Sequence, residues 1–591
     1  MTGAGSLARA AGYGQRGRVA YSAQNAGGHG MDTQAPGLVA RPGGRVLADA
    51  LVAQGIDHVF AVPGESYLDV LDGLYGVRDR LTLVTCRFEA GAVNMAEAHG
   101  KLTGRPAAAM VTRGPGACHG AVGVHVAMQD STPLLLFVGQ IPFEETDRDS
   151  FQEVDYRRMF GPLAKWVTQI DDARRIPELV AHAVDVATTG RPGPVVIALS
   201  EEMQKHSVSV ADIGRAPVSF GRPDAAALER RQAMLAASRK PLAILGGSGW
   251  TDAGRAAVRG FLVGQGLPVA VGFRRQALYD GTLPNFIGDL GVGSDPALVV
   301  RAREADLILA IGTRLGEATT QGYQLFPAQG GAPIIHVYPD PAEIGRVFRP
   351  ALGIASELNA FAHAAAALTP VAAPWADWTA SLRALREAGR VVPEYEGPLN
   401  LAQVMRELET LAPPDAIFTS DAGNFATWPA RFINFGAGQR MIGPTNGAMG
   451  YGVPAGVAAA IMFPGRLAIT FVGDGGMLMT GQEIATAFQY GAAPVVLVFN
   501  NAMYGTIRMY QERSYPGRVS GTDLTNPDFA KYIEAFGGHG EVVSATAEFT
   551  PAFQRAVASG KPAVIELRMN PEQITSHATI AQLRAGTMAK P

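Results

Sequence analysis

An aspartate between two glycines, followed by a pair of asparagines with 24 residues in between, is the most specific chemical pattern in the sequence. It consists of Gly473-Asp474-Gly475 and Asn500-Asn501. Each half follows an apolar run that predicts a strand, and a helix is predicted over residues 481–490 between them. A parallel βαβ unit of this length places Asp474 and Asn501 together at the carboxyl edge of a sheet. Because Mg²⁺ prefers such oxygens together with phosphates, we expect Asp474, Asn501 and a nearby backbone carbonyl to bind Mg²⁺.

Glycines around Asp474 allow the backbone to approach a phosphate closely. Gly473, Gly475 and Gly476 have no side chain to block that approach, so we expect them to contact the same ligand. Either half of the pattern alone is typical of an ordinary strand-ending turn. The two halves, on either side of one βαβ unit, indicate a metal-bound phosphate ligand.

Strands and helices alternate along most of the chain, and these elements must position the site. The first block has strands predicted over residues 58–62, 81–86, 107–111, 134–138 and 195–199, and helices over 46–54 and 91–100. Later strands are predicted over 242–245, 307–311 and 334–337, and then over 416–419, 467–472, 494–499 and 563–567. Continuous apolar strands separated by helices predict parallel sheets covered on both faces. The fold class is therefore α/β, with three successive parallel-sheet domains.

Changes in composition mark the domain limits. We expect a disordered N-terminal tail (residues 1–40), three domains (41–205, 225–370 and 395–575) and a C-terminal tail (576–591). Segments 206–225 and 370–396, rich in Pro with Arg, Asp or Ala, are predicted to be linkers. The N-terminal segment has no apolar stretch typical of a secretory signal, and Met31 is an alternative start. A mitochondrial-type presequence is the competing interpretation, since acidic residues are absent before Asp32.

Overall composition excludes several classes of protein. Of the 591 residues, 47% are hydrophobic and 17% charged, which suits three or four buried cores rather than disorder. A formal net charge of −3 predicts no nucleic-acid or membrane partner, and no apolar run reaches the length of a transmembrane helix. The two cysteines, Cys86 and Cys118, form no disulfide framework, so we expect a reducing, cytoplasmic location.

Several further pieces accompany the aspartate–asparagine pattern in a fixed order. They are Phe60-Ala-Val-Pro-Gly64, Arg87-Phe-Glu89, Gly114-Pro-Gly-Ala117, Gly139-Gln140, Phe151-Gln-Glu153 and Gly447-Ala-Met-Gly450. Together these motifs resemble the thiamine diphosphate (ThDP) enzyme superfamily, and most closely the catalytic subunit of acetolactate synthase and its relatives. The resemblance covers residues 40 to 570 and implies pyrimidine-binding, central and diphosphate-binding domains. It also implies a ThDP- and Mg²⁺-dependent decarboxylation or carboligation of a small 2-oxo acid.

The resemblance assigns roles to individual residues. Met503 is implied as the third metal ligand, through its backbone carbonyl. Glu89 is implied to hydrogen-bond N1′ of the aminopyrimidine, which makes the 4′-amino group acidic enough to activate the thiazolium carbon. Met449 is implied to support the bent cofactor, and the Gly447 carbonyl to accept from N4′. Further cofactor-binding residues implied by the match are Gly423, Asn424, Phe425 and Gly505.

Substrate residues match acetolactate synthase less completely. Phe151 and Gln152 match active-site positions, and Arg314 matches an arginine that holds the carboxylate of the acceptor. His119, on the loop after Gly114-Pro-Gly, is a candidate base, although a lone histidine is more often structural. Other positions differ: a lysine becomes Glu201, a tryptophan Tyr510, a Gln-His pair Asn424-Phe425 and a methionine Thr506. The cofactor machinery is therefore retained while the substrate wall is changed.

Several alternatives stay open at this point. FAD, which acetolactate synthases bind in the central domain, is a second cofactor that the turn Gly246-Gly247-Ser248-Gly249 only weakly indicates. The competing activity is a ThDP-dependent 2-hydroxyacyl-CoA lyase or oxalyl-CoA decarboxylase, and a non-enzymatic ThDP-binding regulator is disfavoured by Glu89, Asp474 and Asn501. Glyoxylate carboligase is disfavoured because it lacks the glutamate at position 89. The resemblance also implies a homodimer or homotetramer, because Glu89 and Asp474 lie in different domains and must serve one cofactor.

Overall fold

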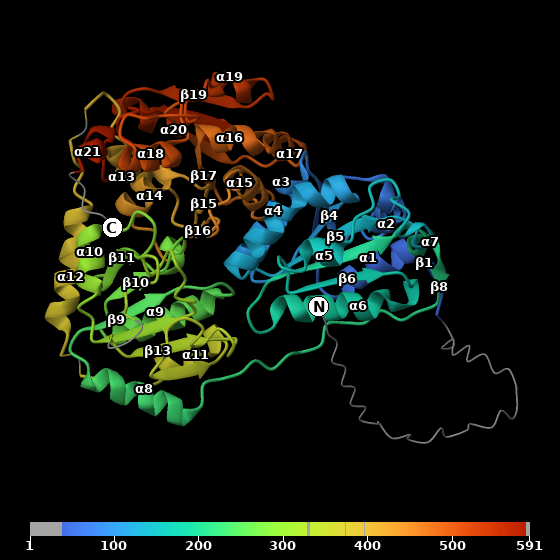
Figure 1. The fold of residues 1–591 in the computed structure, drawn as a ribbon, viewed down its shortest axis with the longest axis horizontal. Coiled ribbons are helices and arrows are strands. Elements are labelled where there is room, and N and C mark those ends of the chain that lie inside the picture. Colours follow the sequence, from blue (N-terminus) through green and yellow to red (C-terminus); the bar gives the residue numbers. More distant parts are fainter. Residues whose placement is uncertain (1–37, 328–330, 373, 395, 587–591) are drawn as a thin grey trace, which may run out of the picture. The chain divides into compact units, whose positions relative to one another are not determined.

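A computed structural model describes residues 38–327, 331–372, 374–394 and 396–586. The predicted tail at residues 1–40 lies outside this part of the chain except for residues 38–40, as do residues 587–591 of the predicted C-terminal tail. Within the described part, three six-stranded sheets contain only parallel strand pairs (Figure 1). The predicted fold class, three successive parallel-sheet α/β domains, is confirmed.

The first domain has the strand order β3-β2-β4-β5-β7-β6 and a small antiparallel pair, β1-β8. Its strands are β1 (Arg41–Pro42), β2 (His58–Ala61), β3 (Thr82–Thr85), β4 (Ala108–Val111), β5 (Leu134–Gln140), β6 (Trp166–Ile170), β7 (Pro194–Ser200) and β8 (Ser207–Val208). Its helices are α1 (Gly43–Ala53), α2 (Leu68–Tyr75), α3 (Glu89–Thr103), α4 (Gly114–Asp130), α5 (Tyr156–Phe160), α6 (Ile176–Thr188) and α7 (Glu201–Lys205). The predicted strands of this block all form; β4, β5 and β7 are continuous buried runs, whereas in the edge strand β3 only Val84 is buried.

The central domain has the strand order β11-β10-β9-β12-β13-β14. Its strands are β9 (Pro241–Leu245), β10 (Val269–Val271), β11 (Phe286–Asp289), β12 (Leu307–Ile311), β13 (Ile334–Tyr338) and β14 (Leu352–Ala355). Its helices are α8 (Ala225–Ala237), α9 (Asp252–Gly264), α10 (Pro296–Ala302) and α11 (Leu358–Ala366), and α12 (Ala376–Gly389) follows.

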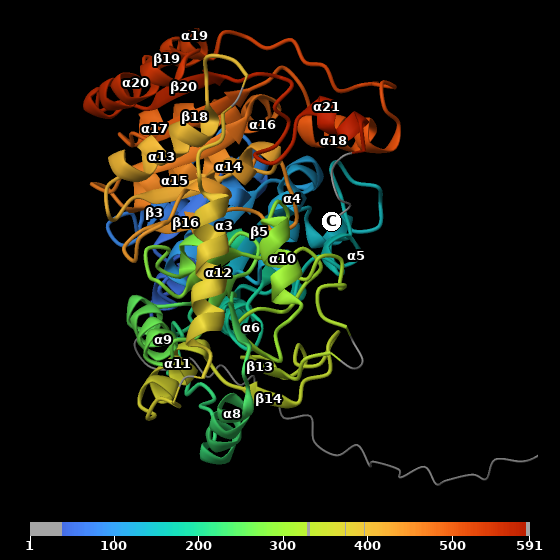
Figure 2. The same ribbon diagram turned by 90° about the vertical axis from the view of Figure 1, so that its left-hand side faces the viewer.

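Helix α12 lies in the segment predicted to be a linker, so that prediction is wrong for residues 376–389. Its buried residues Trp378, Leu382 and Arg386 recur at helical spacing and pack on the central domain. The Arg386 guanidinium also donates to the Ala430 and Ile433 carbonyls of the third domain. Figure 2 shows α12, in yellow, beside the green central domain. The helix therefore connects two domains through packing as well as through the chain.

The third domain has the strand order β16-β15-β17-β18-β20-β19. Its strands are β15 (Ile417–Ser420), β16 (Arg440–Ile442), β17 (Ala468–Gly473), β18 (Val495–Asn500), β19 (His539–Val543) and β20 (Ala563–Arg568). Its helices are α13 (Leu401–Leu411), α14 (Thr427–Phe432), α15 (Gly452–Met462), α16 (Asp474–Thr480), α17 (Ile484–Gln489), α18 (Gly505–Ser514), α19 (Phe529–Glu534), α20 (Thr546–Ala558) and α21 (Ile580–Arg584).

A buried charge cluster joins the first and third domains of the chain. The Lys101 ammonium on α3 lies 3.1 Å from Glu97 and 2.9 Å from Asp130, and it donates to the Gly443 carbonyl. The Tyr451 hydroxyl, at the start of α15, donates to Glu97 at 2.7 Å. Removing one partner would leave a buried charge uncompensated, so this cluster fixes how α3 and α15 pack. No helix among the described residues is long and apolar enough to cross a membrane.

Candidate active site

Asp474 and Asn501 lie at the carboxyl ends of the neighbouring strands β17 and β18, as the βαβ pattern predicts. Asp474 is 3% exposed; one carboxylate oxygen accepts from the Gly475 amide at 3.0 Å and the other from the Asn526 side chain at 2.8 Å. The Asn501 amide oxygen accepts from the backbone N–H of Met503 at 3.3 Å. Ala502, between Asn501 and Met503, has a left-handed backbone at φ 53°, which turns the chain sharply after β18.

The surroundings of Asp474 suit a cation. Burial raises the pKa of its carboxyl, while the hydrogen bond from Asn526 opposes that shift. All of its hydrogen-bond donors are neutral amides, and among the described residues no lysine, arginine or histidine forms an ion pair with it. A buried carboxylate without a positive partner is costly unless it loses its charge or binds a metal. Asp474, Asn501 and Met503 thus form a donor set that fits Mg²⁺.

Asn526 contacts the candidate site although no sequence pattern predicts it there. Its side-chain nitrogen donates to both Asp474 and Asn500, at 2.8 and 2.9 Å, so it links the ends of β17 and β18. The only sequence signal is the turn Thr525-Asn526-Pro527, which is common in loops.

Asp421, at the end of β15, is a second residue of this kind. Its buried carboxylate accepts from the backbone N–H groups of Ala422, Gly450 and Tyr451 at 2.7, 2.9 and 3.3 Å. Burial raises its pKa to about 6. A Cβ on Gly476 would lie 2.4 Å from this carboxylate, so glycine is needed there for packing. Asp421 therefore holds the segment that carries Gly447 and Met449.

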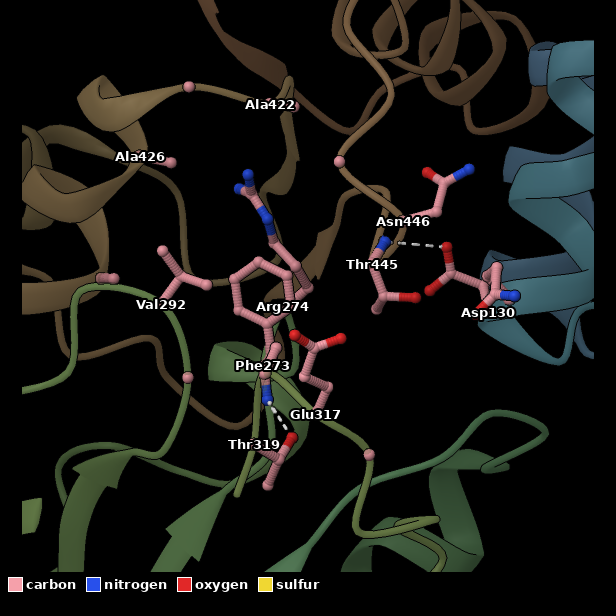
Figure 3. A pocket seen from close by; sticks show the side chains of 18 of the residues that line it. Asp130, Phe273, Arg274, Val292, Glu317, Thr319, Ala422, Ala426, Thr445 and Asn446 are labelled. Carbon is pink, nitrogen blue, oxygen red and sulfur yellow. Dashed lines mark hydrogen bonds between the residues drawn. The ribbon is translucent and has the colours of Figure 1, made fainter. Parts of the chain in front are cut away.

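A cavity of about 1260 Å³ runs along the strand ends of the central and third domains. Figure 3 shows Arg274 and Glu317 of the central domain, Thr445 and Asn446 of the third domain, and Asp130 of the first around it. The predicted residues that line the cavity are Arg314, Gly423, Asn424, Phe425, Gly447, Met449, Gly473, Asp474, Gly475, Gly476, Asn501, Met503 and Gly505. The structure thus brings the predicted third-domain residues together with Arg314.

The central-domain end of the cavity includes the glycine turn considered for FAD. A Cβ on Gly247 would lie 2.4 Å from the Gly312 carbonyl, and the Gly247 carbonyl itself accepts from Arg275. Close packing of two turns therefore accounts for this glycine without a nucleotide. Arg314 donates to the Gln129 carbonyl at 2.6 Å, and burial lowers the pKa of its guanidinium.

First-domain candidates form a separate group. Glu89 is the first residue of α3, and one oxygen of its carboxylate lies 3.0 Å from Nδ1 of His119 on α4. The Glu89 side chain is 14% exposed and that of His119 53%. The Gln152 carbonyl accepts from the Gly114 amide at 3.1 Å, and Gln152 has the left-handed φ of 66°. Phe151 is 75% exposed, so its ring lies on the surface of the chain.

These first-domain candidates do not line the cavity formed by the described residues of the chain. Glu89, His119, Phe151 and Gln152 are absent from its wall, whereas Asp474, Asn501 and Met449 are in it. Within one chain, the predicted site residues therefore form two separate groups, one in the cavity and one in the first domain outside it.

Two of the departures from the acetolactate synthase pattern contact each other. The Thr506 hydroxyl donates to the Asn424 side-chain oxygen at 3.0 Å, and the Asn424 amide nitrogen lies 3.3 Å from the Gly505 carbonyl. A third departure, Glu201, pairs with Arg113 at 2.6 Å, beside the Gly114 turn. Asn424 and Thr506 thus contact each other in the cavity wall, whereas Glu201 pairs with Arg113 outside that wall.

Three family models match successive parts of the chain. They are the thiamine pyrophosphate enzyme N-terminal TPP binding domain at residues 41–159, central domain at 228–365 and C-terminal TPP binding domain at 421–567. The chain belongs to the thiamine pyrophosphate enzyme family. It is a ThDP-dependent enzyme, since thiamine pyrophosphate is another name for ThDP, and the resemblance noted in the sequence is confirmed.

Relatives of this thiamine pyrophosphate enzyme are acetolactate synthases. The acetolactate synthase isozyme 2 large subunit of Escherichia coli (strain K12) is 28% identical, over 89% of this chain and 95% of that protein. The acetolactate synthase large subunits of Corynebacterium glutamicum and Lactococcus lactis are each 30% identical. Those matches cover 89% and 84% of this chain, and 86% and 87% of the two relatives.

Proposed function

We propose that the chain catalyses the Mg²⁺- and ThDP-dependent decarboxylation or carboligation of a small 2-oxo acid. The observation that carries this proposal is the buried Asp474 carboxylate, which has only neutral donors and lies beside Asn501 in a large cavity. The acetolactate synthase relatives support the choice of substrate class.

The residues of the chain have separate tasks in this proposal. Asp474, Asn501 and the Met503 carbonyl would hold Mg²⁺, and Gly423 to Phe425 and Gly505 would hold the diphosphate of ThDP. When bound, ThDP would supply a nucleophilic carbon and a place for the electron pair that decarboxylation of a 2-oxo acid leaves behind. Glu89 holds a proton at N1′ of the aminopyrimidine, and Met449 supports the bent cofactor.

Oligomerisation completes the proposed site. Glu89 and Asp474 must contact one cofactor, yet within a chain Glu89 is outside the cavity wall of the described residues. A two-fold homodimer, or a homotetramer built from two such dimers, supplies the first-domain residues of one chain to the third domain of the other. The exposure of Phe151 and Met449, 75% and 37%, favours this arrangement because both become covered by the partner.

The identity of the acceptor substrate differs from that of acetolactate synthase in this proposal. Asn424, Thr506 and Glu201 replace the residues that those enzymes carry at the matching positions, and Glu201 is held by Arg113. Arg314, which lines the cavity, is proposed to hold the carboxylate of the acceptor.

An acyl-CoA lyase is the second candidate, and one observation favours it. The central-domain end of the cavity is lined by arginines, namely Arg191, Arg274, Arg275, Arg314 and Arg346. Guanidinium groups suit the phosphates of coenzyme A. All five of these arginines already bond to other residues of the chain, as Arg191 does to Glu343, so the 2-oxo acid reaction is preferred.

A substrate screen tests the proposal. Purified protein with ThDP and Mg²⁺ is incubated with 2-oxo acids or with 2-hydroxyacyl-CoA and oxalyl-CoA, and released CO₂ and products are identified. ThDP-dependent CO₂ release from a free 2-oxo acid supports the first candidate, and cleavage of a thioester supports the second. Turnover of neither class would contradict both. The flavin absorption spectrum of the same protein tests for FAD, and a cytoplasmic location stays a prediction.

A further inference from the structure

A segment of the third domain holds the turn that leads into α3 of the first domain. The segment comprises residues 483–490, and the turn comprises residues 85–88, directly before Glu89. Tyr490 accepts from the Thr85 amide at 2.7 Å and donates to the Leu83 carbonyl at 3.0 Å. The Gln489 side-chain oxygen accepts from the Arg87 guanidinium at 2.7 Å. The turn is therefore fixed by side chains that lie about 400 residues away in the sequence.

Glu483 makes the central contact. One of its carboxylate oxygens accepts from the backbone N–H groups of Arg87 and Phe88, at 3.0 and 2.9 Å. The other accepts from the Thr486 hydroxyl at 2.7 Å. Both amides precede the first turn of α3, where a negative charge is also favoured by the helix dipole. Glu483 thus occupies the place of an N-terminal cap, although it comes from another domain.

Gly91 shows how closely this contact is fitted. A Cβ at Gly91 would lie only 2.4 Å from the Glu483 carboxylate, so a side chain at this position of α3 would displace that carboxylate. Glu483 is fully buried, and burial raises the pKa of its carboxyl while the hydrogen bonds oppose that shift. Burying a carboxylate lowers the free energy of unfolding unless hydrogen bonds in the folded protein compensate for the lost hydration.

We propose that Glu483 is a positioning residue for Glu89. It fixes the backbone of Arg87 and Phe88 and so sets the direction of the first side chain of α3. The inference rests on the proposed function of Glu89, and it adds a residue of the third domain to the machinery that places it.

Glu483 belongs to the βαβ unit that also carries the proposed metal ligands. Residues 483–490 lie between Asp474 and Asn501 in the same βαβ unit. The same βαβ unit therefore carries the proposed metal ligands at the carboxyl ends of its two strands, while the helical segment between those strands contacts the turn before Glu89. In the proposed dimer, Glu89 of one chain shares a site with Asp474 of the other chain. Glu483 therefore acts, through Glu89 of its own chain, on a different site from the one that Asp474 of its own chain serves.

Three variants test the role of Glu483. Glu483→Ala leaves two partly buried backbone N–H groups without an acceptor, so amide hydrogen exchange of peptides covering residues 85–92 should rise about tenfold or more in the cofactor-free protein. The value of kcat should fall by about 10- to 100-fold, with KM and ThDP affinity little changed. Glu483→Gln retains an oxygen acceptor for both amides and should recover most of the exchange protection and of kcat. Gly91→Ala displaces the carboxylate and should reproduce the effect of Glu483→Ala with Glu483 present.

Glu548 provides a matched control. Its exposed carboxylate also accepts from two backbone N–H groups, those of Ser544 and Ala545, at a helix N-terminus. Glu548→Ala should leave kcat and the exchange of residues 85–92 unchanged. Unchanged exchange in Glu483→Ala, or equal loss of kcat in the Ala and Gln variants, would overturn the inference. A wild-type protein without any ThDP-dependent turnover would instead overturn the proposed function, and the exchange measurement then decides alone whether Glu483 holds the turn.

Discussion

Asp474 is a buried carboxylate that accepts a hydrogen bond from a neutral neighbour, Asn526. Replacing Asp474 by alanine removes a proposed metal ligand, whereas Asn526→Ala removes a hydrogen-bond donor to Asp474 and Asn500. We expect Asp474→Ala to abolish Mg²⁺-dependent ThDP binding, and Asn526→Ala to weaken it by about 10- to 100-fold. Calorimetric titration of ThDP with Mg²⁺ measures both, and Asp172→Ala, at a partly exposed aspartate of the first domain, serves as control. Unchanged affinity in Asp474→Ala would remove it from the metal site.

Glu89 is expected to be needed for chemistry and not for folding. Its carboxylate is partly exposed and bonds His119, so Glu89→Gln should preserve the circular dichroism spectrum and ThDP affinity. Turnover should fall by at least about 100-fold, because a glutamine holds no ionisable proton at that position. His119→Ala should lower turnover less, since that ring is half exposed and its bond to Glu89 is replaceable by water. Wild-type proton exchange at the thiazolium carbon in Glu89→Gln would contradict the role of Glu89.

Residues of the site differ in how far the sequence could reveal them. Asp474 and Asn501 are recognisable because their strands are continuous apolar runs and the spacing belongs to one βαβ unit. Asn526 and Asp421 escape because each acts through a contact between loops, and Asn526 is 52 residues from Asp474. No local pattern predicts such contacts, since the polar turn residues involved are common in any loop.

At the scale of elements, the strands missing from the predictions are mostly at or near sheet edges. β6, β14, β16 and β19 are edge strands, and in β19 only Val543 is fully buried. Edge strands have one free side and often a solvated face, so their sequences lack the continuous apolar run used to predict the inner strands. In the same way, α12 was missed because its apolar residues form a narrow stripe in a Pro- and Ala-rich segment.

A buried glutamate, Glu512, attaches helix α21 to helix α18. Glu512 on α18 is fully buried and accepts from the Arg584 guanidinium through both oxygens, at 2.7 Å each. This bond holds the pKa of Glu512 at about 2, below the ordinary value near 4.3 for an unfolded chain. The Glu512–Arg584 pair therefore contributes fully to the free energy of unfolding above about pH 4.3, and this contribution is lost as the pH falls through about 2.

This acid gives a pH-dependent prediction. Glu512→Gln should lower the apparent Tm at about pH 6, and the difference from wild type should shrink as the pH falls toward about 3. Differential scanning calorimetry at several pH values measures it. A difference that grows on acidification would contradict the assignment, and the exposed Glu178→Gln, which pairs with Arg175 at the surface, is the control.

For the whole molecule, the shared site predicts complementation between inactive chains. In a heterodimer of Glu89→Gln and Asp474→Ala chains, one of the two sites receives both intact residues. Random mixing makes half of the dimers mixed, so activity should return to about a quarter of wild type. Assay of the mixture after subunit exchange, with dimers quantified by native mass spectrometry, measures it. Proven heterodimers without recovered activity would exclude a site shared between chains.

The cluster around Lys101 has a consequence for how this polypeptide can be divided. The first domain is held to the third by buried charges and by the 483–490 segment, whereas residues 214–220 of the linker are all exposed. The covalent link through this stretch therefore contributes little to keeping the domains together. Two separate genes, one encoding residues 1–216 and the other residues 217–591, should yield fragments that purify as one particle. The enzyme would then behave as a complex of two subunits whose interface already exists within the single chain.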